Sequence, residues 1–213
     1  MPRERCDNLR EGLALHPNTS ILAIEPTLSR KSVLADLTRG DGCLEWEMDE
    51  FRDYLEKFKI LERLAAYTLT IDGKDAVGWA NCFTEDGIFG QGDKAIRGRD
   101  SLRAYAKVHG STLGSRHITT SPCYQIDETG IIATGRSTTV VTVATPSGYK
   151  IAMTGFYEDE LKKINNDWLI SRRWATVEGL PKDPGYSMLT ADPQMAEMVQ
   201  PLLDAWQRLS EKV

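Results

Sequence analysis

The chain has few of the residues that build metal and cofactor sites. Its 213 residues include four cysteines, at positions 6, 43, 82 and 123, and three histidines. No CxxC pair occurs and no histidine stands at ligand spacing from a cysteine, so the thiols are expected to be free. The motifs HExxH, GxSxG, GxGxxG and GxxxxGKS are absent. Zinc-hydrolase, serine-hydrolase and nucleotide-binding functions therefore lack support, and no metal or cofactor is expected.

Long apolar runs and an excess of positive charge are also missing. The sequence has no stretch of about 18 apolar residues, the length that a membrane-spanning helix needs. Its N-terminal apolar patches are too short and interrupted for a secretory signal. Lys and Arg number 26 against 31 Asp and Glu, which gives a net charge of -5, whereas nucleic-acid-binding domains carry a basic surface. We therefore expect a soluble, cytoplasmic protein that binds neither membranes nor nucleic acid.

The chain has the composition of a globular protein, with 41% apolar and 27% charged residues. Its sequence pattern divides it into three consecutive parts. Residues 1–46 show no sustained period and are expected to form an N-terminal extension, weakly ordered or docked. Residues 47–178 are expected to form the main domain. Residues 179–213 are expected to form a Pro/Gly-rich loop followed by a helix, which Pro201 would kink or split in two.

Helices are expected in the first half of the main domain. Residues 74–83 predict a short second helix, and a third begins at Asp100 or Ser101, either of which could cap it. Before them, residues 47–70 predict an amphipathic helix, because apolar side chains recur at steps of three and four. Its buried stripe is expected to contain Phe51, Leu55, Phe58, Leu61 (or Glu62), Leu64 (or Ala65) and Leu69.

After residue 114 the apolar period changes from that of a helix to that of a strand. Four runs rich in β-branched and aromatic residues, within 115–178, are separated by the turn sequences DETG, TPSG and INND. This pattern predicts an antiparallel meander of four strands. Helices followed by a meander indicate an α+β fold with the helices packed on one face of a curved antiparallel sheet.

The order of these elements resembles the SnoaL-like domain of the nuclear transport factor 2-like superfamily over roughly residues 48–178. The motifs that carry the resemblance are DGKDAVGWANCFTEDG, IRGRDSL, SRHITT, TGFYEDEL and NDWLISRR. It implies a cone-shaped sheet wrapped on N-terminal helices, a pocket open at one end, and assembly as a homodimer or homotrimer. Similar members include scytalone dehydratase, bile-acid dehydratase, hexachlorocyclohexane dehydrochlorinase and polyketide cyclases, but non-catalytic subunits share the fold.

The resemblance to the dehydratase branch also implies a catalytic pair, Asp72 and His117. In those relatives the histidine abstracts a proton while the carboxylate orients and stabilises it. Three positions depart from scytalone dehydratase. Ile71 replaces a tyrosine, the position of its second histidine corresponds to about Ser137 here, and that of its late asparagine to about Tyr157. These departures argue against the same substrate and the same assistance to the leaving group.

The residues themselves allow this pair and a simpler alternative. A histidine ordinarily titrates near pH 6.5, so His117 is suited to act as a neutral base near pH 7. Strand alternation places it on one face with Ser115, Thr119 and Ser121, and the alternative is a hydrogen-bonded core histidine. Asp72 could instead cap the helix that starts near Lys74, and Asp75 competes for either role.

Further side chains are candidates for the pocket. The phenol of Tyr157 could hydrogen-bond a substrate carbonyl, or Tyr157 could simply pack on its strand. His109 closes a helix, where a cation suits the helix dipole, and no catalytic role is expected for it. The residues expected to line a pocket for a ring-bearing ligand are Tyr67, Trp79, Phe83, Thr119, Ser137, Met153 and Trp174.

These features predict a cofactor-independent lyase or isomerase, dehydratase-like or a cyclase, acting on a small cyclic or aromatic metabolite. His117 would remove a proton next to an activating group, and Asp72 would hold and stabilise His117. The alternative is a non-catalytic ligand-binding or assembly subunit with the same fold. In such a subunit Asp72 and His117 would lie apart, or would bond only to the backbone.

Overall fold

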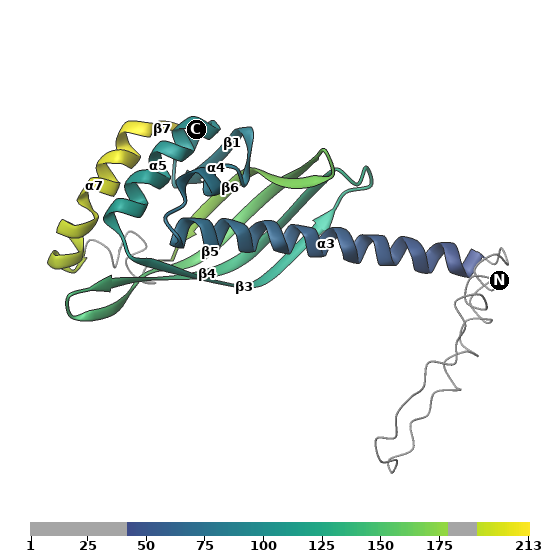
Figure 1. Cartoon of the computed structure of the whole chain (residues 1–213), viewed down its shortest axis with the longest axis horizontal. Helices are drawn as coiled ribbons and strands as arrows, with labels where there is room; N and C mark the ends of the chain where they lie inside the picture. The colour runs from purple at the N-terminus through teal and green to yellow at the C-terminus, as the bar shows by residue number, and fades with distance from the viewer. Residues whose placement is uncertain (1–41, 179–190) are drawn as a thin grey trace, which may run out of the picture. The chain divides into compact units, whose positions relative to one another are not determined.

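The computed structural model describes residues 42–178 and 191–213. The chain divides into two compact units, Met1–Tyr54 and Leu55–Val213. The described part of the first unit is the start of helix α3, and the second unit contains the rest of α3, the other helices and the sheet (Figure 1). Most of the predicted extension over 1–46 and the predicted loop over 179–190 lie outside the described residues, although α3 begins at Gly42, earlier than predicted.

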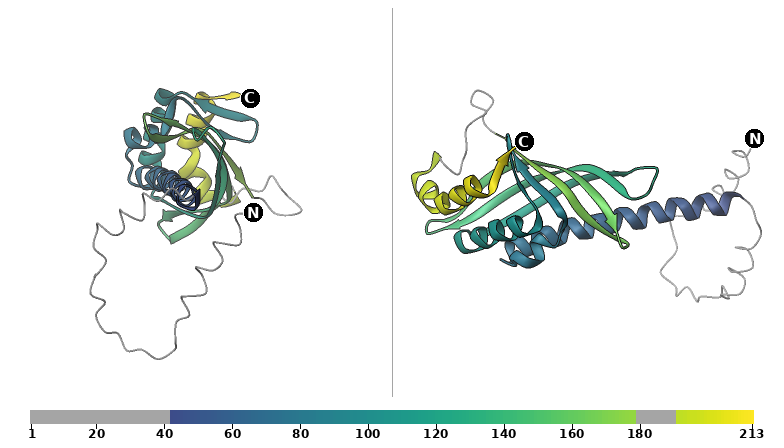
Figure 2. Two further views of the ribbon diagram at one scale, coloured as in Figure 1. Left: turned by 90° about the vertical axis from the view of Figure 1, so that its right-hand side faces the viewer. Right: turned by 90° about the horizontal axis from the view of Figure 1, so that it is seen from above.

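The second unit combines helices with a curved sheet, which confirms the predicted α+β class (Figure 2). The helices are α3 (Gly42–Asp72), α4 (Ala76–Ala80), α5 (Arg99–Thr112) and α7 (Pro193–Leu209). The strands are β1 (Phe83–Gln91), β2 (Lys94–Arg97), β3 (Ser115–Ile126), β4 (Ile132–Thr145), β5 (Gly148–Ile164), β6 (Asp167–Val177) and β7 (Ser210–Lys212). None of the helices in the described part of the chain is both long and apolar enough to span a membrane.

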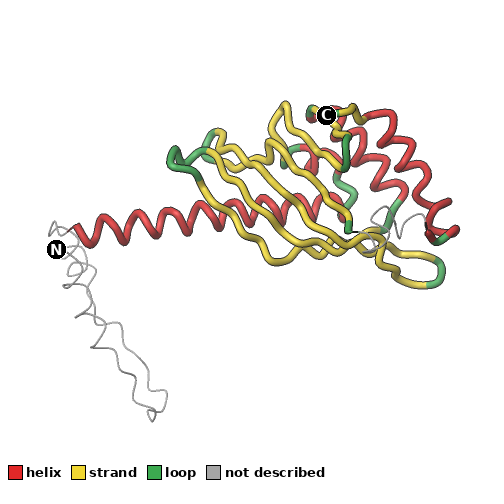
Figure 3. The backbone as a smooth tube through the Cα atoms, turned by 180° about the vertical axis from the view of Figure 1, so that it is seen from behind, coloured by secondary structure: helices red, strands yellow, loops and turns green. Residues whose placement is uncertain are grey.

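The described strands form a sheet in the order β3-β4-β5-β6-β1-β2-β7. Figure 3 shows the backbone of this sheet from behind. Strands β3 to β6 form the predicted antiparallel meander. The sheet is not antiparallel throughout, however, because β1 pairs in parallel with β6. Parallel neighbours need a long crossover, and α5 and the meander supply one. β1 begins at Phe83, so the predicted helix over 74–83 is reduced to the short helix α4.

Helix α3 buries a different stripe from the predicted one. Of the predicted residues, Leu64 is buried, whereas Phe58 is 60% exposed and Leu69 is 72% exposed. Both stripes have helical spacing, so the period alone could not choose between them. The buried residues of α3, at steps of four, three and four, are Ile60, Leu64, Tyr67 and Ile71.

The turn after α3 separates the roles of two aspartates. Asp75 is the N-cap of α4, and its side chain accepts a hydrogen bond from the Gly78 backbone N–H at 2.8 Å. Lys74 adopts a left-handed conformation with φ 62°, which lets the chain reverse between the two helices. Because Asp75 caps α4, the carboxylate of Asp72 is left for a partner elsewhere in the fold.

A buried ion pair lies between β5 and β6. Asp159 pairs in register with Arg173, and the guanidinium donates two hydrogen bonds, of 2.7 and 2.8 Å, to the carboxylate. Tyr124 donates a third at 2.5 Å. The guanidinium carbon of Arg173 lies 4.1 Å from the ring centroid of Tyr67 and 4.3 Å from that of Tyr157, so it packs against both rings as a cation–π contact.

The C-terminal helix closes a second part of the core. Helix α7 is one helix that contains Pro201, rather than two, and Asp192 caps its first turn. Its Met195, Val199 and Leu202 pack with Leu113, Val143 and Ala152. In Figure 1, α5 and α7 lie side by side at the same end of the sheet.

Candidate functional site

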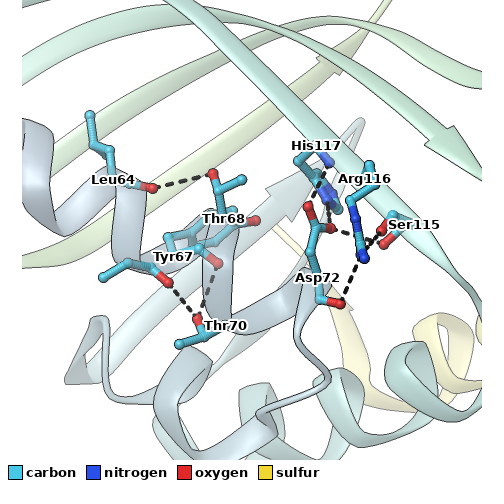
Figure 4. A network of polar contacts seen from close by, with 9 residues as sticks. Leu64, Tyr67, Thr68, Thr70, Asp72, Ser115, Arg116 and His117 are labelled. Carbon is cyan, nitrogen blue, oxygen red and sulfur yellow. Dashed lines mark hydrogen bonds and ion pairs between the residues drawn. The ribbon is translucent and has the colours of Figure 1, made fainter.

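Asp72 and His117 are joined by a short hydrogen bond. The His117 ring nitrogen Nδ1 lies 2.6 Å from Asp72 Oδ1, and the backbone N–H of His117 donates to Asp72 Oδ2 at 2.8 Å. Figure 4 shows the carboxylate at the end of α3 pointing to the histidine on β3. Their side chains are 10% and 9% exposed, respectively. An imidazole bonded through Nδ1 to a carboxylate keeps its Nε2 for other chemistry.

Strand β3 also fixes Asp72 through the residues next to His117. Ser115 Oγ donates to Asp72 Oδ1 at 3.1 Å, and the Arg116 guanidinium donates to the Asp72 backbone carbonyl at 3.2 Å. Ser115 and His117 share one face of the strand while Arg116 is exposed on the other, as the predicted alternation requires. The carboxylate is therefore held at both oxygens.

These hydrogen bonds keep Asp72 charged in spite of its burial. Burial alone raises the pKa of the Asp72 carboxyl, but hydrogen bonds from the side chain and backbone of His117, and from Ser115, bring it below its ordinary value. The carboxylate is thus ionised at neutral pH and accepts a hydrogen bond from His117 Nδ1–H.

His117 opens onto a cavity of about 320 Å³ between the helices and the concave face of the sheet. Its wall is contributed by α3, α4, α5, α7 and strands β1, β3, β4, β5 and β6. Among the described residues that line it, none is Lys, Arg, Asp or Glu. The volume is at the lower end of the range of about 300–1,000 Å³ that is usual for small-molecule sites.

The structure brings part of the predicted pocket together. Tyr67, Trp79, Met153 and Tyr157 line the cavity with His117. Tyr157 is 2% exposed and pairs in register with Ser137, four residues along β4 from the Val141 that pairs with His117. Burial raises the pKa of the Tyr157 phenol, against the opposing effect of Arg173, so the phenol is protonated at neutral pH.

Two predicted aromatic residues lie outside the cavity wall. Phe83 is fully buried behind it and packs edge-on to Tyr67 and Trp79, at centroid distances of 5.9 and 5.1 Å. Trp174 projects from the opposite face of β6 to Ala175, and its ring covers Gly90, where a Cβ would come within 2.2 Å of it. Strand alternation is the reason, because successive side chains point to opposite faces.

Two predicted hydroxyl residues also lie outside the wall. Thr119 is two residues beyond His117 on the same face, but it pairs with Thr139 and does not line the cavity. Ser137 is 1% exposed and is buried beside the phenol of Tyr124. Thr119 is two residues from His117 along β3, and Ser137 is four residues from Val141 along β4, so both are displaced from the His117–Val141 pair.

His109, for which the sequence suggests no role, is part of the cavity wall. It is 7% exposed, its ring centroid is 5.9 Å from that of His117, and its Nδ1 has no hydrogen-bond partner among the described residues. Burial, and then the neighbouring His117, lower its pKa to about 4 although Asp72 opposes them. The expected cation at the helix end is therefore a neutral imidazole. Only the step of four from Tyr105 to His109 to Leu113, all in the wall, signals this in the sequence.

The low pKa of His109 predicts that acid weakens the fold in a defined window. An unfolded histidine titrates near 6.5 and folded His109 near 4, so between these values the unfolded chain binds a proton that the folded chain does not. Stability should then fall by about 3 kcal/mol as the pH drops through this range. Urea denaturation should show a shallower loss in His109→Gln, which cannot titrate, and equal pH slopes would contradict the assignment.

A metal centre is not apparent in this part of the protein. Within residues 42–178 and 191–213, no group of three or more His, Cys, Asp or Glu side chains is arranged to hold an ion. Cys82 is buried and Cys123 is exposed, and both are free thiols. The chemistry of the cavity is therefore argued from its histidines, phenols and carboxylate.

Comparisons with known proteins agree with this architecture. The family description of the SnoaL-like domain matches residues 52–174. Rv3472, a protein of unknown function from Mycobacterium tuberculosis, has a similar structure, with 42% identity and a TM-score of 0.73 over 78% of this chain and 96% of that one. No curated protein matches the sequence.

Two more distant structures, both from Novosphingobium aromaticivorans, share the fold alone. One is a nuclear transport factor 2-like protein with a cystatin-like fold, at 19% identity and a TM-score of 0.59, covering 68% of this chain and 95% of that one. The other is a protein proposed to be a scytalone dehydratase, at 19% identity and a TM-score of 0.54, covering 59% and 86%. The nuclear transport factor 2-like fold predicted from the sequence is thereby confirmed.

Proposed function

The chain belongs to the SnoaL-like domain family, and from this premise we propose that it is a cofactor-independent lyase or isomerase for a small cyclic metabolite. The observation that carries the proposal is the 2.6 Å bond between His117 Nδ1 and Asp72 Oδ1 at the wall of a cavity. Dehydration is the favoured reaction, with double-bond isomerisation and cyclisation as related outcomes of the same first step.

The first step is proton abstraction by His117. Nδ1–H donates to the ionised Asp72, so the lone pair of Nε2 is available to a C–H bond next to a substrate carbonyl. The imidazolium that forms is stabilised by the carboxylate, and positioned acid–base groups of this kind typically contribute about 10²- to 10⁴-fold in rate. In a dehydration the imidazolium then returns the proton to the departing hydroxyl oxygen, and water leaves.

Tyr157 is proposed to assist at the departing oxygen. Its phenol is protonated and buried in the cavity wall, so it can donate a hydrogen bond to an oxygen that gains negative charge. Arg173, behind the ring at 4.3 Å, favours this polarisation. The phenol acts as a hydrogen-bond donor, and the proton balance of the reaction is carried by His117 alone.

The lining argues for an uncharged substrate. A carboxylate or phosphate in a cavity of this size would need a Lys or Arg partner, since an unpaired buried charge is strongly unfavourable. The described lining has no such residue and is mostly aromatic and aliphatic. We therefore propose a neutral molecule of one or two rings that carries a ketone and a hydroxyl group.

The alternative of a non-catalytic binding subunit is less favoured. Such a subunit has no need for a desolvated Asp–His pair, and it would leave the two residues apart or bonded only to backbone. The side-chain bond of Asp72 to His117, with Ser115 as an additional donor, instead supports a group built for proton transfer.

Proton abstraction can be tested before the natural substrate is known. 1-Indanone is a neutral bicyclic ketone whose protons next to the carbonyl exchange with deuterium when a base removes them. Exchange in D₂O is monitored by ¹H NMR, and we expect the protein to accelerate it. In His117→Gln the acceleration should fall by at least about 10²-fold. Exchange that is equally fast with the variant would contradict the proposal. A panel of hydroxylated cyclic ketones, followed by mass spectrometry for loss of water, then identifies the full reaction.

A further inference from the structure

We propose that His109 is the residue that binds the substrate's carbonyl oxygen, donating a hydrogen bond to the oxygen that gains negative charge when His117 removes the neighbouring proton. The inference rests on the proposed function, because it takes this cavity as the place where a ketone binds. It adds a second histidine, from α5, to the site formed by α3 and β3.

The position of His109 is the first argument. Its ring centroid lies 5.9 Å from that of His117, with an angle of 40° between the ring planes, and both rings line the same cavity. A carbonyl oxygen is bonded to the carbon next to the one that loses its proton. A donor for that oxygen therefore has to lie beside the base, and His109 does.

An unsatisfied polar atom is the second argument. His109 is 7% exposed, yet its Nδ1 has no hydrogen-bond partner among the described residues. Buried polar groups are nearly always paired, and leaving one unpaired is unfavourable. That atom is itself covered, so a rotation of the His109 ring toward the cavity that it lines would let a ligand oxygen provide the missing partner.

The other candidate donors fit this task less well. His117 Nδ1–H is already bonded to Asp72, so its Nε2 presents a lone pair and cannot donate to a ketone. Trp79 also has an unpartnered buried N–H, but its ring packs among Tyr67, Phe83, Phe89 and Tyr105. The phenol of Tyr157 is already assigned to the departing oxygen, and its ring packs against Tyr67 and the Arg173 guanidinium.

The neutral state of His109 suits a donor of this kind. Its pKa of about 4 leaves it uncharged at neutral pH, so a charged imidazolium does not stand next to the imidazolium that forms on His117. A neutral imidazole can still polarise a carbonyl, an arrangement known from enzymes that enolise ketones. Both the electrostatic repulsion and the cost of burying two cations are avoided.

The step is balanced without any further reactant. His117 Nε2 forms a bond to the proton, the C–H bond breaks, and its electron pair forms a carbon–carbon double bond while the carbonyl electrons move onto the oxygen. His109 N–H holds that enolate oxygen. Return of the proton to another carbon completes an isomerisation, and expulsion of a hydroxyl, protonated by His117, completes a dehydration.

A pair of probes separates oxygen binding from shape. 1-Indanone and indane have the same skeleton and differ by the ketone oxygen. By isothermal titration, wild type should bind 1-indanone about tenfold more tightly than indane, the size expected for one hydrogen bond. His109→Phe should bring the ratio of the two Kd values to about one, whereas His109→Asn, which keeps a donor near the Nδ1 position, should restore part of the preference.

Ser111→Ala is the control, because it changes an exposed polar side chain of the same helix, two residues from His109 and outside the cavity lining, and it should leave the ketone preference in place. A wild type without a preference for 1-indanone, or a preference that survives in His109→Phe, would overturn the inference. The exchange assay keeps the two proposals apart. If His117→Gln abolishes exchange while His109→Phe keeps the ketone preference, the inference alone fails. If the ketone preference requires His109 but deuterium exchange is as fast in His117→Gln as in wild type, the proposed reaction alone fails.

Discussion

Asp72→Asn is expected to lower the rate of proton abstraction by about 10²- to 10³-fold while leaving the protein folded. An amide at this position can donate to His117 Nδ1, which favours the tautomer that carries its proton on Nε2. The lone pair that should face the substrate is then lost, and no negative charge remains to stabilise an imidazolium. Deuterium exchange of 1-indanone measures the rate, and circular dichroism verifies the fold.

Asp75→Asn is the matched control for this prediction. It is the same substitution three residues along the chain, at the N-cap of α4, where asparagine is as good a capping residue as aspartate. Its exchange rate should stay near that of wild type. Equal losses in the two variants would mean that the bond from Asp72 to His117 has no special role.

Arg173→Met is expected to destabilise the fold by about 3–5 kcal/mol. Arg173 is 1% exposed and provides both hydrogen bonds that neutralise Asp159, so its loss leaves a buried carboxylate with only the phenol of Tyr124. Urea denaturation measures the change in the free energy of unfolding.

Two further variants check that the cause is the buried pair. Arg172→Met changes the neighbouring, exposed arginine and should cost less than about 1 kcal/mol. The double variant Asp159→Leu/Arg173→Met removes both charges, so it should recover much of the loss. A cost for Arg173→Met no larger than that for Arg172→Met would contradict the account.

The sequence predicts the fold class and the Asp72–His117 pair because both depend on local signals. The change of period after residue 114 and three short turn sequences are enough for the meander. Asp72 and His117 are implied by the family resemblance that the short motifs carry. The capping role of Asp75 explains why Asp75 is not the partner of His117.

The remaining features depend on packing between distant segments. Two stripes of α3 have helical spacing, and only contact with the sheet selects Ile60 and Tyr67 rather than Phe58 and Leu69. His109 looks like an ordinary residue of a helix end until α5 packs against α4, α7 and β1, where burial removes its charge. Trp174 could face either side of its strand, and the space over Gly90 decides which.

The central claim is that His117 is held by Asp72 with its Nε2 ready to take a proton from the cavity. The ¹⁵N and ¹H NMR signals of the His117 ring, recorded at mildly alkaline pH in wild type and Asp72→Asn, test it most directly. We expect wild type to carry its ring proton on Nδ1, with the proton signal shifted far downfield by the 2.6 Å bond, and the variant to lose this signal and change tautomer. A wild-type proton on Nε2, or identical ring signals in the two proteins, would contradict the account.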